Sequence, residues 1–437
     1  MHPKRILVLV LAAIFNIEAY GQDLGRWAEW QAKVQGPSKL PGATIESIDK
    51  DSPLRAAGLE AGDIILKVNG RLIDSDEVWT DIQYGIRANQ VLRLQVKRQS
   101  ESRNYSIRLK GKAKEKHAGL DTYYEAFTNN YGIRQRVIIT KPTNANTKLP
   151  AVLMIGGLSC SSMELYPGRS SNWARVINDV VEDTDMVVMR IEKPGVGDSE
   201  GDCAETDFYT ELDGIREAAK LLKSKDYVDT TRIVVYGSSM GSALAPVIAN
   251  EFNFAGVVSD GTFFKTWYEH MLEIERRIRQ MQGDSESEIA KKMNQFYIPL
   301  YHGMLIEKRT YQEVVDQYPA IASHNYHGAR HMYGRPTEYY KQLQDFDFAG
   351  AWEKIKVPVR IMRGTNDWIM SEFDNKMIIE VLDRNGHEDH ALYQYPGLDH
   401  WNTIHEKPAD SFFGKEGKWE DEISGKIVRW LREMAGS

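Results

Sequence analysis

A serine flanked by glycines, in the stretch Gly237-Ser238-Ser239-Met240-Gly241, is the strongest chemical feature of this sequence. It follows the mostly apolar run 232–236, which predicts a strand, and precedes segment 242–249, which predicts a helix. A strand that turns sharply into a helix through G-x-S-x-G exposes the central serine, and the glycines let the backbone pass close by. A serine hydroxyl attacks a carbonyl carbon only when a base takes its proton. Ser239 is therefore predicted to be a nucleophile.

A histidine and a carboxylate suited to this task follow further along the chain. Segment 357–363 predicts a buried strand, and Asp367 lies in the turn after it. Segment 391–395 predicts another strand, and His400 lies just beyond its end. Functional groups of open α/β sheets gather at the carboxyl ends of the strands. We therefore predict His400 as the base and Asp367 as its orienting acid, with Asp260 as the alternative acid.

From about residue 120 onward the chain resembles an α/β-hydrolase, in particular the serine-aminopeptidase and esterase-like branch that carries a helical cap. The order serine, acid, histidine is the order of that family. Segment 149–155 followed by Gly156-Gly157-Leu158 resembles the strand and His-Gly-x oxyanion loop, with Gly156 in place of the usual histidine. The resemblance implies an oxyanion hole made by the backbone N–H groups of Leu158 and Met240. Segment 186–199 is similar to the strand and glycine turn of the family.

The expected fold class is therefore α/β, with a mostly parallel sheet and a helical cap over residues 113–437. The cap is expected at about 264–350, where segments 267–282 and 287–297 have helical periodicity. A cap would exclude water from the reacting groups. Three histidines, His324, His327 and His331, have helical spacing, but no carboxylate completes a metal site. We expect neither a metal nor a cofactor.

Two cysteines occur in the sequence, Cys160 just past the oxyanion glycines and Cys203 just past the glycine turn. In α/β-hydrolases the strands that feed these two loops are neighbours, so the resemblance implies a disulfide beside the mouth of the active site. An exported protein can form such a bond. The alternative is a pair of unrelated buried cysteines.

Residues 1–21 have the pattern of a signal peptide. Lys4-Arg5 precede the apolar run 6–15, and Ala19-Tyr20-Gly21 offers small residues for cleavage. We expect a periplasmic or secreted protein, whether this segment is cleaved or retained as an anchor. The apolar run is too short to span a bilayer and no other long one follows, so no stable membrane span is expected. The net charge of −7 and the lack of a dense basic stripe give no support to nucleic-acid binding.

Residues 25–112 resemble a bacterial PDZ domain, a small fold of mixed strands and helices. The resemblance rests on Ala-Gly-Leu at 57–59, Gly62-Asp63 and Asn69-Gly70, with a predicted groove helix at 76–86 and strands at 42–48, 91–97 and 104–110. It implies that the C-terminus of a peptide adds as a strand to a sheet edge. No Gly-Leu-Gly-Phe loop is present, and segment 31–34 is the candidate for it. Peptide binding and a purely structural role both remain open.

Together these features predict an exported serine hydrolase that cleaves carboxylic esters through an acyl-enzyme, with a small ester as substrate. One alternative is a serine peptidase or aminopeptidase acting on short peptides. Acidic residues that grip an α-amino group would favour it, and Glu269, Glu273 and Glu275 are the candidates. A second alternative is a non-catalytic binding protein that uses its PDZ domain and keeps only a vestigial hydrolase fold.

Overall fold

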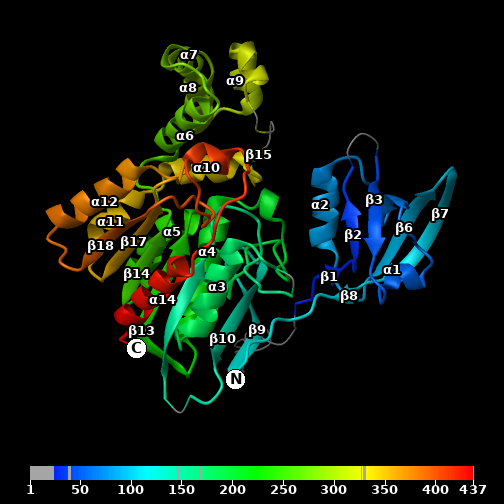
Figure 1. Ribbon diagram of the computed structural model, residues 1–437, viewed down its shortest axis with the longest axis horizontal. Coiled ribbons are helices and arrows are strands. Elements are labelled where there is room, and N and C mark those ends of the chain that lie inside the picture. Colours follow the sequence, from blue (N-terminus) through cyan, green and yellow to red (C-terminus); the bar gives the residue numbers. More distant parts are fainter. Residues whose placement is uncertain are drawn as a thin grey trace, which may run out of the picture.

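The computed structural model describes residues 24–37, 41–145, 147–167, 169–325, 327 and 331–436. The predicted signal peptide, residues 1–21, lies outside the described residues. Figure 1 shows a larger lobe and a smaller lobe, and the blue N-terminal part of the chain forms the smaller one.

The larger lobe is built on an eight-stranded sheet with the order β18-β17-β14-β13-β11-β12-β10-β9. Its strands are β9 (Leu120–Thr128), β10 (Arg134–Pro142), β11 (Leu149–Ile155), β12 (Val187–Ile191), β13 (Val228–Ser238), β14 (Gly256–Asp260), β17 (Val359–Gly364) and β18 (His390–Tyr395). Pairing is parallel from β12 through β18, whereas β9 and β10 pair in antiparallel fashion. This topology confirms the predicted α/β-hydrolase fold with its mostly parallel sheet.

Helices cover both faces of this sheet, because its central strands are apolar on both sides. In β11, Leu153 and Ile155 pack into one core, and Val152 and Met154 pack into the other. The first core also contains residues of α4 (Phe208–Lys223), α5 (Met240–Phe252) and α12 (Glu372–Arg384); the second contains residues of α3 (Asn172–Asp183) and α14 (Glu422–Ala435). Two short elements, η1 (Cys203–Glu205) and α13 (Pro408–Phe412), lie in the loops.

The chain between β14 and β17 is largely helical. It forms α6 (Trp267–Met281), α7 (Glu286–Lys292), η2 (Met293–Tyr297), α8 (Ile298–Tyr301), η3 (His302–Ile306), α9 (Tyr311–Gln317), η4 (Pro319–Ser323), β15 (His331–Met332), β16 (Arg335–Pro336), α10 (Thr337–Asp345) and α11 (Phe348–Lys354). Figure 1 shows α6 to α9 projecting above α10 at the top of the view. The helix expected at 287–297 instead changes from α-helix to a π-helical turn at Met293.

The three histidines of this region do not share a helix face, which corrects the interpretation of their spacing. His324 follows the 3-10 turn η4, His327 lies in a bend, and His331 lies in strand β15. Within the described residues, no group of three or more His, Cys, Asp or Glu side chains is arranged to hold a metal ion.

The smaller lobe has its own antiparallel sheet, in the order β2-β3-β4-β6-β7, and its own apolar core. Its elements are β1 (Ala28–Glu29), β2 (Ala32–Gln35), β3 (Ala43–Ile48), α1 (Pro53–Ala56), β4 (Ile64–Val68), β5 (Arg71–Leu72), α2 (Asp76–Gly85), β6 (Val91–Arg98), β7 (Glu101–Arg108) and β8 (Lys110–Gly111). Asn69 and Gly70 make the turn between β4 and β5 with φ values of 50° and 85°, as an Asn-Gly hairpin turn requires. Residues 32–34, expected in a carboxylate-binding loop, form the edge strand β2 instead, and only Gln31 lies outside it.

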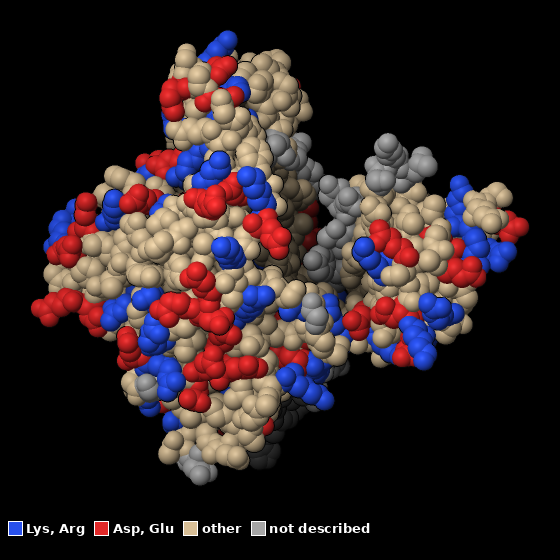
Figure 2. All heavy atoms as spheres, in the orientation of Figure 1, with Lys and Arg blue, Asp and Glu red and all other residues tan. Residues whose placement is uncertain are grey.

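Charges of both signs are interspersed on the face of the molecule shown in Figure 2. Within the described residues, no helix combines the length and the apolar character needed to cross a membrane.

A disulfide joins Cys160, in the loop after β11, to Cys203, in the turn region after β12. The Cα atoms lie 5.9 Å apart. The two loops follow neighbouring parallel strands, so the bond fastens them at the same edge of the sheet.

Because 43 residues separate the two cysteines, the chain-entropy relation assigns the bond about 4 kcal/mol of stability. We expect a reducing agent to lower the melting temperature of the wild-type protein. The Cys160→Ala/Cys203→Ala double variant should melt lower and be insensitive to the reductant. Differential scanning calorimetry with and without reductant measures these melting temperatures. A wild-type melting temperature that does not change on reduction would contradict the prediction.

Candidate active site

Ser239 lies at the junction of β13 and α5, in a conformation that side chains seldom adopt. Its φ is 55° and its ψ is −121°, and such strain persists only where the surrounding structure enforces it. A Cβ atom on Gly237 would overlap the carbonyl of Gly241, and a Cβ atom on Gly241 would overlap that of Ile155. Both glycines are therefore required by close backbone approach, and the turn directs the serine away from the packed helix.

A chain of hydrogen bonds links the three residues predicted from the sequence. His400 Nε2 lies 2.9 Å from Ser239 Oγ, and His400 Nδ1 lies 2.9 Å from Asp367 Oδ2. The other oxygen of Asp367, Oδ1, accepts the backbone N–H groups of Ile369 and Met370, at 2.8 Å each. The carboxylate is thereby held with one oxygen toward the histidine.

Asp260, the alternative acid, has a different contact. Its Oδ2 accepts a hydrogen bond from the Tyr236 hydroxyl at 3.0 Å, and its backbone carbonyl accepts the N–H of Ser239 at 2.8 Å. Burial raises the pKa of Asp260 to about 6. The geometry therefore favours Asp367 over Asp260 as the partner of His400.

The charges of the pair stabilise each other. Burial alone would lower the pKa of His400, but the Asp367 carboxylate raises it above its ordinary value. Burial acts to raise the pKa of Asp367, but His400 and the N–H of Met370 lower it below its ordinary value. The pair therefore favours a protonated imidazole beside an ionised carboxylate, the charge state that forms when a serine gives its proton to a histidine.

Asp399 shapes the loop that carries His400, a role that its position beside the histidine did not reveal. Its Oδ1 accepts the N–H groups of Trp401 and Thr403 at 2.9 and 2.8 Å, and its Oδ2 accepts the Ser411 hydroxyl at 2.6 Å. Aspartates commonly close such loops by bonding to N–H groups further along.

The loop after β11 reaches Ser239 through a glycine. A Cβ atom on Gly157 would lie 2.9 Å from the Cβ atom of Ser239, which is too close. Among the described residues, neither the N–H of Leu158 nor that of Met240 donates to a protein acceptor. Met240 is the first residue of α5, where N–H groups have no acceptor within the helix. Both N–H groups predicted for the oxyanion hole thus remain available for a ligand.

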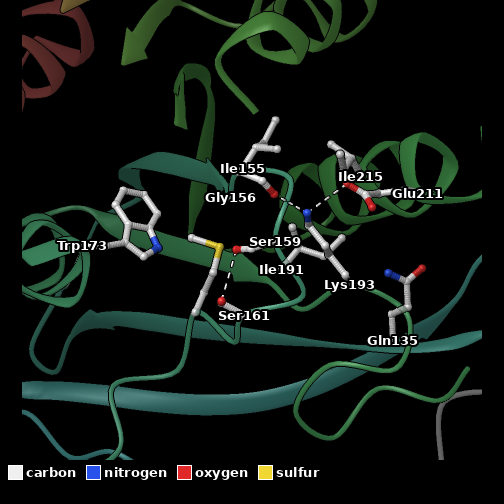
Figure 3. A pocket seen from close by; sticks show the side chains of 12 residues that line it. Gln135, Ile155, Gly156, Ser159, Ser161, Trp173, Ile191, Lys193, Glu211 and Ile215 are labelled. Atoms are coloured by element: carbon white, nitrogen blue, oxygen red, sulfur yellow. Dashed lines mark hydrogen bonds and ion pairs between the residues drawn. The ribbon is translucent and has the colours of Figure 1, made fainter. Parts of the chain in front are cut away.

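A buried charged cluster lies behind this loop (Figure 3), and the sequence pattern did not predict it. Lys193 Nζ donates to the carbonyl of Gly157 and lies 3.2 Å from Glu211 Oε1. Glu211 Oε2 pairs with Arg335, which also lies 2.9 Å from the sulfur of Cys203. Burial lowers the pKa of Lys193 to about 8. The three charged residues come from three distant segments, so no local motif identifies them.

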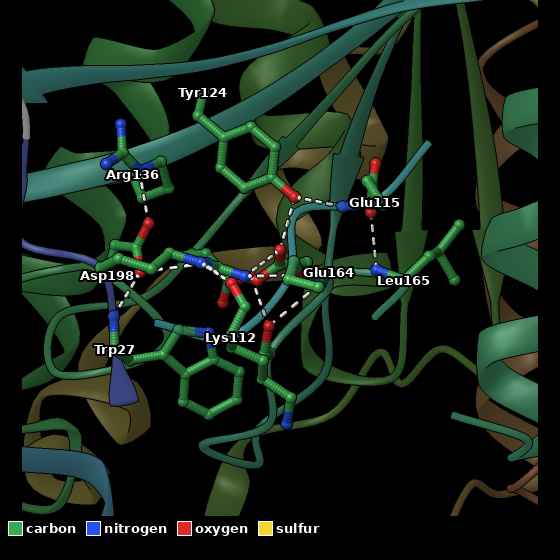
Figure 4. A network of polar contacts seen from close by, with 12 residues as sticks. Trp27, Lys112, Glu115, Tyr124, Arg136, Glu164, Leu165 and Asp198 are labelled. Carbon is green, nitrogen blue, oxygen red and sulfur yellow. Dashed lines mark hydrogen bonds and ion pairs between the residues drawn. The ribbon is translucent and has the colours of Figure 1, made fainter. Parts of the chain in front are cut away.

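A second network ties the N-terminal segment to the loops around the site (Figure 4). Arg26 lies 2.8 Å from Glu164, in the loop after β11, and 3.1 Å from Asp198, in the glycine turn after β12. The backbone N–H of Trp27 also donates to Asp198, at 2.9 Å, and Arg136 Nε binds the other oxygen of that aspartate at 3.2 Å. The chain that leads into the smaller lobe is thus anchored on the active-site side of the larger lobe.

The smaller lobe matches a known domain family. A sequence model of the PDZ domain family matches residues 23–109. This part of the chain is a PDZ domain. Over 72 residues the chain is also 33% identical to a probable periplasmic serine endoprotease DegP-like of Halomonas elongata. That match covers 16% of this chain and 15% of the endoprotease.

Outside the PDZ domain family, the chain is similar to esterases. It is 22% identical over 287 residues to esterase EstD of Thermotoga maritima, a match that covers 64% of this chain and 62% of the esterase. Among solved structures, acetyl xylan esterase 1 from Thermoanaerobacterium is 16% identical with a TM-score of 0.43, covering 74% of this chain and 86% of that one. Est1E from Butyrivibrio proteoclasticus, with bound ferulic acid, is 16% identical with a TM-score of 0.45, covering 72% of this chain and 100% of that one.

The elevated pKa of His400 predicts the pH dependence of turnover. A base must be deprotonated to act, so kcat/KM should rise with pH through a midpoint above about 6.5, the ordinary histidine value. Asp367→Asn removes the charge that raises this pKa, so the midpoint should move to lower pH. The same change should lower kcat by about 10⁴. Initial rates between about pH 5 and 9 measure both effects.

Asp260→Asn is the matched control for that substitution, because it also neutralises a buried aspartate at a strand end. It should leave the acid-side midpoint closer to that of the wild type and lower kcat far less. A larger loss in Asp260→Asn than in Asp367→Asn would reverse the assignment of the acid.

The network around Arg26 predicts a large cost for its removal. The side chains of Glu164 and Asp198 are only 2% and 0% exposed, and removing one partner of a buried pair costs about 3–5 kcal/mol. We expect Arg26→Ala to lower the free energy of unfolding by about 3 kcal/mol. Arg103→Ala breaks an exposed pair with Glu101 and should leave the free energy of unfolding nearly unchanged, because such pairs are screened by solvent. Guanidinium denaturation measures the free energy of unfolding of both variants. Equal losses in the two would contradict this prediction.

Proposed function

We propose that this protein is an exported serine hydrolase that cleaves carboxylic esters. The observation that carries the proposal is the chain from Ser239 through His400 to Asp367, with 2.9 Å at each step. Ser239, His400 and Asp367 lie at the ends of β13, β18 and β17, and Ser239 lies beside Gly157. This arrangement also supports the proposal. The similarity to esterase EstD agrees with it.

The reaction begins when Ser239 Oγ bonds to the ester carbonyl carbon and its proton passes to His400 Nε2. Asp367 stabilises the imidazolium through Nδ1. The carbonyl oxygen becomes an oxyanion and accepts hydrogen bonds from the N–H groups of Leu158 and Met240. His400 then gives the proton to the leaving alcohol oxygen as the carbon–oxygen bond breaks. In the second half, His400 takes a proton from water as the water oxygen bonds to the acyl carbon, and it returns the proton to Ser239 Oγ as the bond between that oxygen and the acyl carbon breaks. These steps use only groups of the protein, so the proposal needs no cofactor.

The acidic side chains of α6 favour an ester over a peptide with a free α-amino group. Glu273 pairs with Lys265 and with Arg277, the latter at 3.4 Å. Glu275 accepts the Tyr301 hydroxyl at 2.7 Å, and Glu269 is engaged in the capping box that begins α6. Because each carboxylate has a partner, none of them stands ready to bind an ammonium group of a substrate.

The helices between β14 and β17 serve in this proposal as the cap over the reacting groups. α6 begins seven residues after the end of β14. Because β13 and β14 are parallel neighbours, α6 follows the same end of the sheet at which Ser239 lies. The PDZ domain contributes a binding surface for the C-terminus of a peptide at edge strand β2. Export is supported by the disulfide and by the match of 72 residues of the chain to a protein described as periplasmic.

A fluorophosphonate probe and two substrate sets test the proposal. The wild-type protein should be labelled once and should hydrolyse p-nitrophenyl esters with a higher kcat/KM than aminoacyl-p-nitroanilides. Ser239→Ala should remain folded, lose the label and lose at least about 10⁴ in kcat. Ser323→Ala, which changes an exposed serine, should behave as the wild type.

Three results would contradict this function. Labelling that persists in Ser239→Ala would place the nucleophile elsewhere. A folded wild-type protein that neither takes the probe nor cleaves either substrate set would instead favour the non-catalytic binding protein. Faster cleavage of the nitroanilides would favour the peptidase.

A further inference from the structure

The peptide unit between Gly157 and Leu158 is held from behind by a lysine. Lys193 Nζ donates a hydrogen bond to the Gly157 carbonyl, and Figure 3 shows the ion pair of Lys193 with Glu211. Cis peptide bonds are absent from the described residues. In a trans peptide the C=O and the following N–H point in opposite directions. The bond to Lys193 therefore fixes the direction of the Leu158 N–H.

The packing around this peptide leaves a void on one side. The loop borders a cavity of about 30 Å³, lined by Gly156, Gly157, Ser159, Ile191 and Lys193 among others, which has room for a water molecule or two. Gly156 and Gly157 have no side chains that could hold this peptide in one orientation.

Lys193 is itself fastened by buried partners. Its side chain is 11% exposed, that of Glu211 is 4% exposed and that of Arg335 is 0% exposed. Arg335 donates to the carbonyl of Thr206 at 3.3 Å and lies 2.9 Å from the sulfur of Cys203. Glu211 thus has two cationic partners, and the ammonium group of Lys193 is aimed at the Gly157 carbonyl rather than at solvent.

We propose that Lys193 is a positioning residue that holds the Gly157–Leu158 peptide so that its N–H faces the oxyanion formed on attack by Ser239. The inference rests on the proposed function. The positive charge also draws electron density from the carbonyl, because hydrogen bonds in a chain polarise one another. The Leu158 N–H becomes a stronger donor as a result, and the effect is largest in the transition state, where the negative charge develops.

Substitution of Lys193 separates this role from a structural one. Lys193→Met removes the donor and the charge but leaves Glu211 paired with Arg335, so the protein should fold. We expect kcat to fall by about tenfold to a hundredfold, with KM within about threefold of the wild type, because the interaction acts in the transition state. The affinity for a trifluoromethyl ketone, which forms a tetrahedral adduct, should fall by the same factor as kcat/KM.

Lys225→Met is the matched control. Lys225 is a comparably buried lysine, 16% exposed, that pairs with Glu125 near the amino end of β13, away from Ser239. It should leave kcat and the ketone affinity unchanged. Lys193→Gln restores a neutral donor to the Gly157 carbonyl, so its kcat should lie between those of Lys193→Met and the wild type.

The outcomes distinguish this inference from the proposed function. If Ser239→Ala abolishes ester hydrolysis but Lys193→Met keeps wild-type kcat, only the role of Lys193 is overturned. A fall in kcat without a matching loss of ketone affinity also overturns it. If Lys193→Met fails to fold, Lys193→Gln carries the same comparison of kcat with ketone affinity. If Ser239→Ala retains full activity, the proposed function fails whatever Lys193 does.

Discussion

The backbone of Ser239 is the constraint on which the rest of the site depends. Holding a serine at a φ of 55° costs of order 1–3 kcal/mol. The strain is offset by α5, whose residues 240–249 are all buried against the sheet, and by the bond from the Ser239 N–H to the Asp260 carbonyl. Because the backbone is held on both sides of Ser239, the position of its hydroxyl group is restricted. Asp367 and His400 reach that place from the ends of β17 and β18 only because these strands run parallel to β13.

The loops that face Ser239 are fastened to one another more firmly than their glycine content suggests. Glu192, at the start of the turn after β12, accepts the Ser162 hydroxyl at 2.6 Å and the Met163 N–H at 3.0 Å. The disulfide joins the same two loops a few residues away, and Arg26 spans them from outside. Three independent contacts thus oppose any separation of the loop after β11 from the glycine turn. The anchor of the PDZ domain is one of the three, and the first residues of that domain contact both lobes.

The sequence predicts the parts of this arrangement that are encoded locally. Ser239 and the strand–turn positions of Asp367 and His400 each have a recognisable pattern of apolar residues followed by a turn. The sequence favoured Asp367 and kept Asp260 as the alternative, because both lie at the ends of buried strands; the direction of the two side chains separates them in the structure. The π-helical turns at 293–297 and 302–306 carry the same apolar spacing as ordinary helices. Lys193 and Arg335 were missed because their partners are distant in sequence, and a lysine before a glycine turn has no distinctive spacing.

The charges of Lys193, Glu211 and Arg335 also link the segment between β14 and β17 to the loop beside Ser239. A buried ion is costly unless it is paired, and Glu211 has cations on both sides. Arg335 comes from β16, so a displacement of that segment would leave Glu211 with Lys193 as its remaining cation. The segment between β14 and β17 is therefore connected to the Gly157 carbonyl through three side chains, those of Arg335, Glu211 and Lys193.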